Sequence, residues 1–198
     1  KDLENTHFML LRFFTTFHSV LNDNSIRTIK QKNMFKIRKA TLEDIEMINR
    51  LAWIVFPHTY KEILSPEQME YMMDWMYSPE NLHKQMTEDG HIYYLAFEGD
   101  EPAGYLSIQP EGEHTYHLQK IYVLPSFQGK KLGKLLFEQA IKAIKELHPE
   151  PCQMRLNVNR QNKALTFYEK MGMKKVDEGD LHIGNGYYMN DYIMGLDI

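Results

Sequence analysis

The chain has 198 residues, of which 43% are hydrophobic and 25% charged, and its net charge at pH 7 is −4. This length and composition fit one globular domain, and the acidic balance gives no electrostatic support for a nucleic-acid partner. Cys152 is the single cysteine, which excludes an intrachain disulfide and a cysteine-based metal cluster and favours a reducing, cytoplasmic location. No apolar run approaches the roughly 20 residues that cross a bilayer, so no membrane partner is expected.

Residues 1–33 are expected to be an N-terminal extension, either non-native or a helical arm, ahead of a domain over residues 34–198. Met34 stands directly before Phe35–Thr41, a segment typical of a first strand followed by a helix cap. Within the extension, Phe8–Leu21 is apolar enough for a short amphipathic helix. Its aromatic residues would need to be covered, so we expect packing on the domain or on a second copy, as in a homodimer.

The first part of the domain has helical patterns. Thr41 and Asp44 form a predicted N-cap pair, and apolar residues recur at helical spacing over Ile45–Val55. Pro57 is predicted to end this helix because proline lacks the backbone N–H. Two further helices follow, each opened by a proline: Pro66 and Pro79.

The rest of the domain alternates between strand and helix patterns. Ile92–Phe97 and Ala103–Ile108 are predicted to pair as a hairpin, and His114–Leu124 forms a longer strand. The later predicted elements are a helix reaching Leu147, a strand over Met154–Val158, a helix containing Phe167, and strands over Met173–Val176 and Tyr187–Leu196. The order predicts a mixed α/β fold.

The segment Gln128–Lys134 connects a predicted strand to a predicted helix. A glycine-bearing turn at a helix N-terminus presents backbone N–H groups to anions, and three lysines lie in this segment. Phosphate is therefore the expected ligand. It is not a Walker A loop, because three residues instead of four separate Gly129 from Gly133 and Leu135 replaces the required hydroxyl. The alternative is a basic first turn on an ordinary amphipathic helix.

This segment resembles the acetyl-coenzyme A signature of the GNAT acetyltransferase superfamily, Gln/Arg-x-x-Gly-x-Gly/Ala. Gln128 and Gly133 match the signature, and Lys131 occupies the first glycine position. Because a lysine stands there, we expect that residue 131 needs no positive φ.

A second segment resembles the closing motif of the same superfamily, L-x-V-x-x-x-N-x-x-A-x-x-F-Y-x-K-x-G-F. The matching residues are Leu156, Val158, Asn162, Ala164, Phe167, Tyr168, Lys170 and Gly172. Met173 replaces the usual aromatic residue. Tyr168 could alternatively be an ordinary core aromatic, but two motifs in the family's order make the resemblance specific.

The resemblance implies the GNAT fold, a mixed α/β (α+β) sheet of six to seven strands flanked by helices and splayed at the fourth strand. It also implies acetyl-CoA as cosubstrate and no metal. Backbone groups of the fourth strand would bind the pantetheine arm, and the Val123 N–H would polarise the thioester carbonyl. The implied cofactor-binding residues are Ile121, Tyr122, Val123, Gln128, Gly129, Lys130, Lys131, Leu132, Gly133, Lys134, Asn162, Tyr168 and Lys170.

The implied reaction is acetyl transfer to a primary amine, with Tyr168 as the general acid that protonates the departing thiolate. An alkylammonium has a pKa near 10.4, so a base must first remove a proton. Many relatives carry a glutamate for this task on the fourth strand, where this chain has Gln119. His117 is the candidate base, with a surface histidine as the alternative.

Local sequence around the first helices and the last strand resembles bacterial polyamine (spermidine/spermine) N-acetyltransferases. An aromatic pocket could hold a methylene chain, and a carboxylate could hold a distal ammonium group. The candidate substrate residues are Trp53, Phe56, Tyr60, Asp74 and Trp75, each of which could instead belong to the core of an amphipathic helix. Two other functions stay open: acetylation of a protein or peptide amino group, and coenzyme A binding by a regulator with little catalysis.

Overall fold

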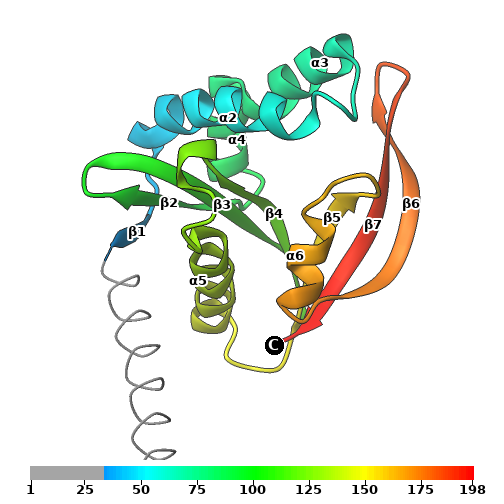
Figure 1. The fold of residues 1–198 in the computed structure, drawn as a ribbon. Coiled ribbons are helices and arrows are strands. Elements are labelled where there is room, and N and C mark those ends of the chain that lie inside the picture. The colour runs from blue at the N-terminus through cyan, green and yellow to red at the C-terminus, as the bar shows by residue number, and fades with distance from the viewer. Residues whose placement is uncertain (1–33) are drawn as a thin grey trace, which may run out of the picture.

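The computed structural model describes residues 34–198 and contains a seven-stranded sheet with helices on both faces (Figure 1). The strand order is β1-β2-β3-β4-β5-β7-β6. The strands are β1 (Phe35–Lys39), β2 (Ile92–Glu98), β3 (Glu101–Gly112), β4 (Thr115–Val123), β5 (Gln153–Asn159), β6 (Lys174–Gly184) and β7 (Tyr187–Asp197). The α-helices are α2 (Ile45–Tyr60), α3 (Pro66–Tyr77), α4 (Pro79–Thr87), α5 (Leu132–Leu147) and α6 (Leu165–Lys170), with short 3-10 turns η1 (Leu42–Asp44) and η2 (Pro125–Phe127). The predicted mixed fold is confirmed, whereas the predicted N-terminal extension lies outside the described residues.

The sheet is antiparallel except between β4 and β5, which are parallel and joined by the crossover helix α5. These two strands pair over three residues only, Thr115–His117 against Gln153–Arg155. Beyond that point β4 continues to pair with β3 and β5 continues to pair with β7. The sheet is therefore open between its fourth and fifth strands, as the resemblance implied.

A β-bulge lies at the point where β4 leaves β5. Leu118 and Lys120 of β4 pair with Ile108 and Ser107, which are adjacent in β3, so Gln119 is an additional residue in β4. Such a bulge bends a strand and increases its twist. After the bulge, Lys120 reaches Gln85 of α4 on one face of the sheet, and Val123 lies against the start of α5 on the other.

The helices form two layers. Helices α2, α3 and α4 cover one face of the sheet, and α5 and α6 cover the other (Figure 1). The amphipathic pattern of α5 explains its place, because its buried residues recur at helical spacing: Leu132, Leu136, Phe137, Ala140, Ala143 and Ile144. A single hydrophobic core fills the space between these helices and the sheet.

The N-cap predicted at Thr41 is present and is held by an ion pair. The Thr41 backbone N–H donates to Asp44 Oδ2 over 2.8 Å, and the Arg38 guanidinium donates to both Asp44 oxygens at 2.7 Å. This bidentate contact lowers the pKa of Asp44 to about 2. The end of β1 is thereby fixed to the start of the first helix.

The prediction that Pro57 ends the first helix is wrong, because α2 continues to Tyr60 with the proline inside it. The Lys61 N–H still donates to the Pro57 carbonyl over 3.0 Å, so the last turn is intact. Phe56 and Tyr60 are buried in this turn with ring centroids 4.5 Å apart. Their packing outweighs the local cost of the proline, about 3 kcal/mol.

Two strands are longer than predicted. Strand β3 runs on to Gly112 and β6 to Gly184, whereas the sequence predicts their ends at Ile108 and Val176. Much of β6 is exposed and has little apolar alternation, so pairing with β7 determines its length. Within residues 34–198, no helix is both long and apolar enough to span a membrane.

Gly104 allows β3 to approach the open half of β4 closely. A Cβ at this position would collide with the carbonyl oxygen of Tyr122 and lie 3.2 Å from Cα of Val123. We predict that Gly104→Ala lowers the free energy of unfolding in urea by about 1–3 kcal/mol, the usual cost of overpacking. Gly112→Ala is the matched control, because a Cβ there meets no atom within 4 Å. Equal stability of the two variants would contradict the prediction.

Candidate active site

The opening between β4 and β5 holds a cavity of about 1440 Å³. It is lined by α2, α3 and β4, by the segment that starts α5, and by β5, α6 and the β6–β7 hairpin. Sites for a single small ligand usually measure about 300–1,000 Å³. The space is therefore sufficient for two substrates side by side.

The segment predicted to bind phosphate forms one part of the cavity wall. Gln128, Gly129, Lys131, Leu132 and Gly133 line it, at the first turn of α5. A first turn leaves backbone N–H groups without partners in the helix, and the helix dipole makes this end attractive to anions. The segment that is expected to bind phosphate therefore faces the cavity at a helix N-terminus.

The prediction for the backbone of Lys131 is wrong. Its φ is +63°, in the left-handed region that the family's glycine would occupy easily. A left-handed conformation costs a residue with a Cβ about 1–2 kcal/mol. The turn into α5 therefore imposes the same backbone conformation on this lysine, and strain of this kind concentrates at functional sites.

Four lysines line the cavity near α5 and α6: Lys131, Lys134, Lys163 and Lys170. Their charges suit a ligand that carries several phosphate groups. Lys130, which was also predicted to bind the cofactor, is not among the lining residues. Its Nζ forms an ion pair with Glu98 at 3.0 Å and lies 4.7 Å from the centre of the Phe127 ring.

The free edges of the two separated strands face the same space. Ile121, Tyr122 and Val123 of β4 line the cavity, as do Leu156 and Val158 of β5. Because β4 and β5 do not pair there, their facing N–H and C=O groups have no strand partner. An extended amide-containing ligand could pair with these groups as an added strand does.

Three phenols meet in the cavity wall, from α2, β4 and α6. Burial raises the pKa values of Tyr60, Tyr122 and Tyr168. Tyr122 and Asn162 lie near the Tyr60 hydroxyl and oppose the rise of its pKa, and the proximity of Tyr60 contributes to the raised pKa of Tyr168. Tyr168 is therefore protonated at neutral pH and available as a proton donor, and the predicted residue Asn162 lies in the same group.

His117 also lines the cavity and is paired with a carboxylate. Its Nδ1 lies 2.9 Å from Oε1 of Glu111, which lines the cavity too. Burial lowers the pKa of His117, although Glu111 opposes this shift. A neutral ring whose Nδ1–H donates to Glu111 has its Nε2 lone pair free to accept a proton.

Lys120 is a buried cation beside the histidine, and sequence reasoning assigned it no role. It is 7% exposed, its Nζ donates to Gln85 Oε1 over 2.9 Å, and it lies over the rings of Tyr77 and Tyr93. Burial lowers the pKa of Lys120 to about 7. Its charge contributes to keeping His117 neutral.

Asp191 of β7 is another cavity residue that the sequence analysis did not assign to the site. It is 5% exposed, lines the cavity, and its Oδ1 has no hydrogen-bond partner among the described residues. Burial raises its pKa to about 6. The available signal was an aspartate two residues after Met189 in a strand rich in apolar and aromatic residues, Tyr187–Asp197, because a charge at an inward position of a strand is unusual.

The predicted substrate residues divide into two groups. Phe56, Tyr60 and Trp75 line the cavity, whereas Trp53 and Asp74 do not. Trp53 is 52% exposed on α2 and Asp74 is exposed on α3. Helical spacing placed both in the correct element but could not decide which way each side chain points.

Helix α3 lies beside the tip of the β6–β7 hairpin (Figure 1). The Tyr71 hydroxyl donates to the Ile183 carbonyl over 2.7 Å, and Gln68 Nε2 donates to the Tyr188 carbonyl over 2.9 Å. The Tyr71 and Tyr187 rings are 5.5 Å apart. These contacts join two segments more than 100 residues apart, both of which contribute residues to the cavity wall.

Comparison with known proteins identifies the architecture. The model of the acetyltransferase (GNAT) domain matches residues 60–194. The chain belongs to the GNAT acetyltransferase family. Accordingly it is an acetyl-CoA-dependent N-acetyltransferase, and the cavity with its helix N-terminus, lysines and free strand edges is suited to acetyl-CoA.

Individual relatives of this GNAT protein have different acceptors. It is 30% identical to a spermidine N(1)-acetyltransferase of Thermoplasma acidophilum over 147 residues, 72% of this chain and 89% of the relative. It is 29% identical to a peptidyl-lysine N-acetyltransferase of Salmonella typhimurium over 96 residues, 48% of this chain and 58% of the relative. Its fold matches the crystal structure of the PaiA N-acetyltransferase of T. acidophilum in complex with coenzyme A, with a TM-score of 0.67 and 28% identity over 81% of this chain and 97% of that one.

The strained lysine of this GNAT domain can be tested by replacement. We predict that Lys131→Gly raises the free energy of unfolding by up to about 1 kcal/mol, because relief of the left-handed strain exceeds the added entropy of the unfolded chain. Gly129→Ala is the opposite control, since Gly129 has φ +77° and no atom within 4 Å of an added Cβ. The Gly129→Ala variant should be less stable than the native chain because of backbone strain alone. Urea denaturation measures both, and a destabilised Lys131→Gly would contradict the prediction.

Proposed function

We propose that this GNAT enzyme acetylates a small primary amine with additional positive charge, a polyamine of the spermidine type. The observation that carries the proposal is the buried Asp191 carboxylate in the cavity, whose Oδ1 has no partner among the described residues. A buried and unpaired carboxylate is costly, and binding of an alkylammonium group would neutralise it.

Arg160 does not pair with Asp191. It favours the charged form of Asp191 and so lowers the Asp191 pKa, but its guanidinium contacts Asp180 at 3.1 Å and Glu178 at 3.8 Å. Asn157 also lowers the Asp191 pKa, and the phenol of Tyr60 lies near the carboxylate. None of these groups forms an ion pair with Asp191, so its carboxylate is available to a cationic substrate.

The contact between α3 and the β6–β7 hairpin favours a small acceptor over a peptide. A peptide would need an open groove, whereas hydrogen bonds from Gln68 and Tyr71 join α3 to the hairpin, and both elements contribute residues to the cavity wall. Phe56, Tyr60 and Trp75 offer aromatic surface to a methylene chain. The similarity to a spermidine acetyltransferase over most of both chains supports the same substrate class.

The residues of the cavity can perform each proton transfer. His117, held at Nδ1 by Glu111, takes a proton from the acceptor ammonium directly or through water. The amine nitrogen then forms a bond to the acetyl carbon, the carbon–sulfur bond breaks, and Tyr168 gives its phenolic proton to the departing thiolate. The second proton, which the nitrogen loses on becoming an amide, returns to the Tyr168 phenolate. Val123 lies in β4, which lines the cavity, and its backbone N–H would donate a hydrogen bond to the thioester carbonyl oxygen.

The second candidate acceptor is a lysine side chain of a protein, favoured by the similarity to a peptidyl-lysine acetyltransferase over about half of the chain. An assay that measures release of free coenzyme A thiol distinguishes the candidates. We expect turnover with spermidine and spermine and little with lysine peptides. Activity confined to peptides would reject the polyamine proposal, and absence of activity with every amine would favour a coenzyme A-binding regulator.

A cytoplasmic location, a homodimer and the absence of a nucleic-acid partner remain predictions from the sequence. Residues 1–33, on which the expected dimer depends, lie outside the described residues.

Tyr168→Phe removes only the phenolic hydroxyl. We predict that kcat falls about 10²-fold or more, the usual contribution of a general acid, while the Kd of acetyl-CoA changes little. Steady-state kinetics and calorimetric titration measure the two quantities separately. An unchanged kcat would exclude Tyr168 as the acid.

Asp191→Asn keeps the shape of the side chain and removes its charge. We predict that kcat/KM for spermidine falls at least roughly tenfold, because loss of one partner of a buried charge pair usually costs 2 kcal/mol or more. In the native enzyme kcat/KM should also fall as the pH drops through about 6, since protonation of Asp191 removes the same charge. Asp74→Asn is the matched control, because the Asp74 side chain is exposed on α3 and does not line the cavity, and it should leave kcat/KM nearly unchanged. Equal effects of the two variants would exclude Asp191 as the cation-binding residue.

A further inference from the structure

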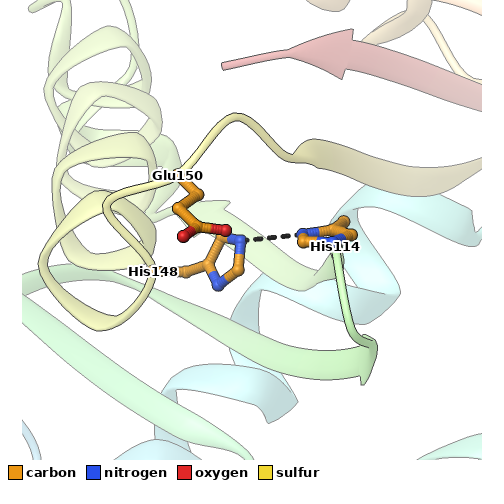
Figure 2. Close-up of side chains that lie close together, drawn as sticks. All are labelled: His114, His148 and Glu150. Carbon is orange, nitrogen blue, oxygen red and sulfur yellow. Dashed lines mark hydrogen bonds between the residues drawn. The ribbon is translucent and has the colours of Figure 1, made fainter.

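Three side chains with metal-binding atoms converge at the start of β4, away from the phosphate-binding turn (Figure 2). His114 lies in the turn between β3 and β4, His148 caps the C-terminus of α5, and Glu150 follows it in the connection to β5. Their ligand atoms all lie within 4.8 Å of one another, and His114 Nδ1 is 3.1 Å from His148 Nε2. Nothing in the acetyl-transfer reaction uses them.

We propose that His114, His148 and Glu150 bind a zinc ion. Tetrahedral zinc with Zn–N bonds of about 2.0–2.1 Å holds two nitrogen ligands roughly 3.3 Å apart. The two imidazole nitrogens need to separate by only a few tenths of an ångström to reach this spacing. With the carboxylate they make three protein ligands, and water completes the tetrahedron. Imidazole nitrogen favours zinc over magnesium or calcium, which prefer oxygen ligands.

Hydrogen bonds fix the backbone of the two histidines before any ion binds. The Gln153 N–H donates to the His114 carbonyl over 2.9 Å, which ties the turn before β4 to the start of β5. The His148 N–H donates to the Ile144 carbonyl over 2.7 Å, which completes the last turn of α5. The ring of Tyr116 lies 6.1 Å from that of His148 and limits its movement. Binding therefore requires side-chain adjustment without rearrangement of the chain.

The location gives the ion a structural consequence. His114 directly precedes β4, and His148 and Glu150 precede β5, so the ion would join the two strands beside their three-residue pairing. The ligands are not among the lining residues of the cavity. Thr115 and Val123 are eight residues apart on β4, about 26 Å at 3.3 Å per residue, which separates the ion from the turn that follows β4. The zinc would stabilise the vertex of the opening, which is the short pairing from which β4 and β5 diverge. It would take no part in acetyl transfer.

Calorimetric titration of the chelator-treated, tag-free full chain with zinc chloride tests this site. We expect one zinc per chain at this site, and affinity reduced at least about tenfold by either His114→Ala or His148→Ala, since loss of even an outer partner of a metal ligand costs 10–100-fold. His83→Ala, which removes an exposed histidine of α4, is the matched control and should bind zinc as the native chain does. Magnesium chloride should give no binding heat at this site.

Thermal unfolding supplies a second measurement. Zinc should raise the Tm of the native chain and of His83→Ala, but not that of His148→Ala, because only a folded vertex brings the ligands together. Glu150→Gln, which keeps the side-chain shape, should also weaken zinc binding. It provides the test if either alanine variant fails to fold. No binding heat, or equal affinity in the His114, His148 and Glu150 variants and the native chain, would overturn the proposal. Binding of acetyl-CoA is independent of this result, so the proposed function would stand.

Discussion

The separation of β4 from β5 after three residue pairs is the constraint on which the rest of the molecule depends. A sheet normally satisfies the backbone of each inner strand on both sides, and leaving two inner edges unpaired is costly unless another group occupies them. Strands β3 and β7 hold the opening in place by pairing with the edges of β4 and β5 that face away from it. The bulge at Gln119 bends β4, Gly104 lets β3 hold its open half closely, and β7 holds β5. The space between the strands is consequently a permanent part of the fold, lined by groups that can pair with an extended ligand.

The other costly features of the structure gather around the same opening. Lys131 has a left-handed backbone, Asp191 has an unpaired buried oxygen, and Lys120 is a buried cation whose pKa burial lowers to about 7. Unfavourable conformations and buried charges of this kind persist where the surrounding structure enforces them, and they tend to mark functional sites. The core beneath α5 and α2 supplies that enforcement, because it buries continuous apolar stripes on both faces of the sheet.

The sequence predicted most of the elements and the turn at the start of α5 because these depend on local patterns. Glycine and proline positions, helical spacing and the residues from Gln128 to Gly133 are all visible in one short window of sequence. The errors have a common physical origin in tertiary contacts. Pro57 lies within α2 because Phe56 and Tyr60 pack below it, and Lys131 is left-handed because the chain must turn there into α5.

The candidate site was only partly predictable for the same reason. Tyr168, His117 and Tyr60 line the cavity as expected, whereas Trp53, Asp74 and Lys130 do not. The direction of a side chain on α2 or α3 depends on which face of the helix meets the sheet. For residues at the edge of the apolar stripe, sequence spacing alone does not determine whether the side chain points to the cavity or to solvent. Asp191 escaped notice because its importance comes from burial beside residues that are distant in sequence, including Tyr60 of α2.

The contact between α3 and the β6–β7 hairpin includes three hydrogen bonds, one of them to the Met189 sulfur, and one pair of rings. Each hydrogen bond contributes about 0.5–1.5 kcal/mol net, so separating the two segments needs only a small fraction of the stability of a domain. Thermal motion can therefore separate the hairpin from α3, which would let substrates enter and products leave on this side of the cavity.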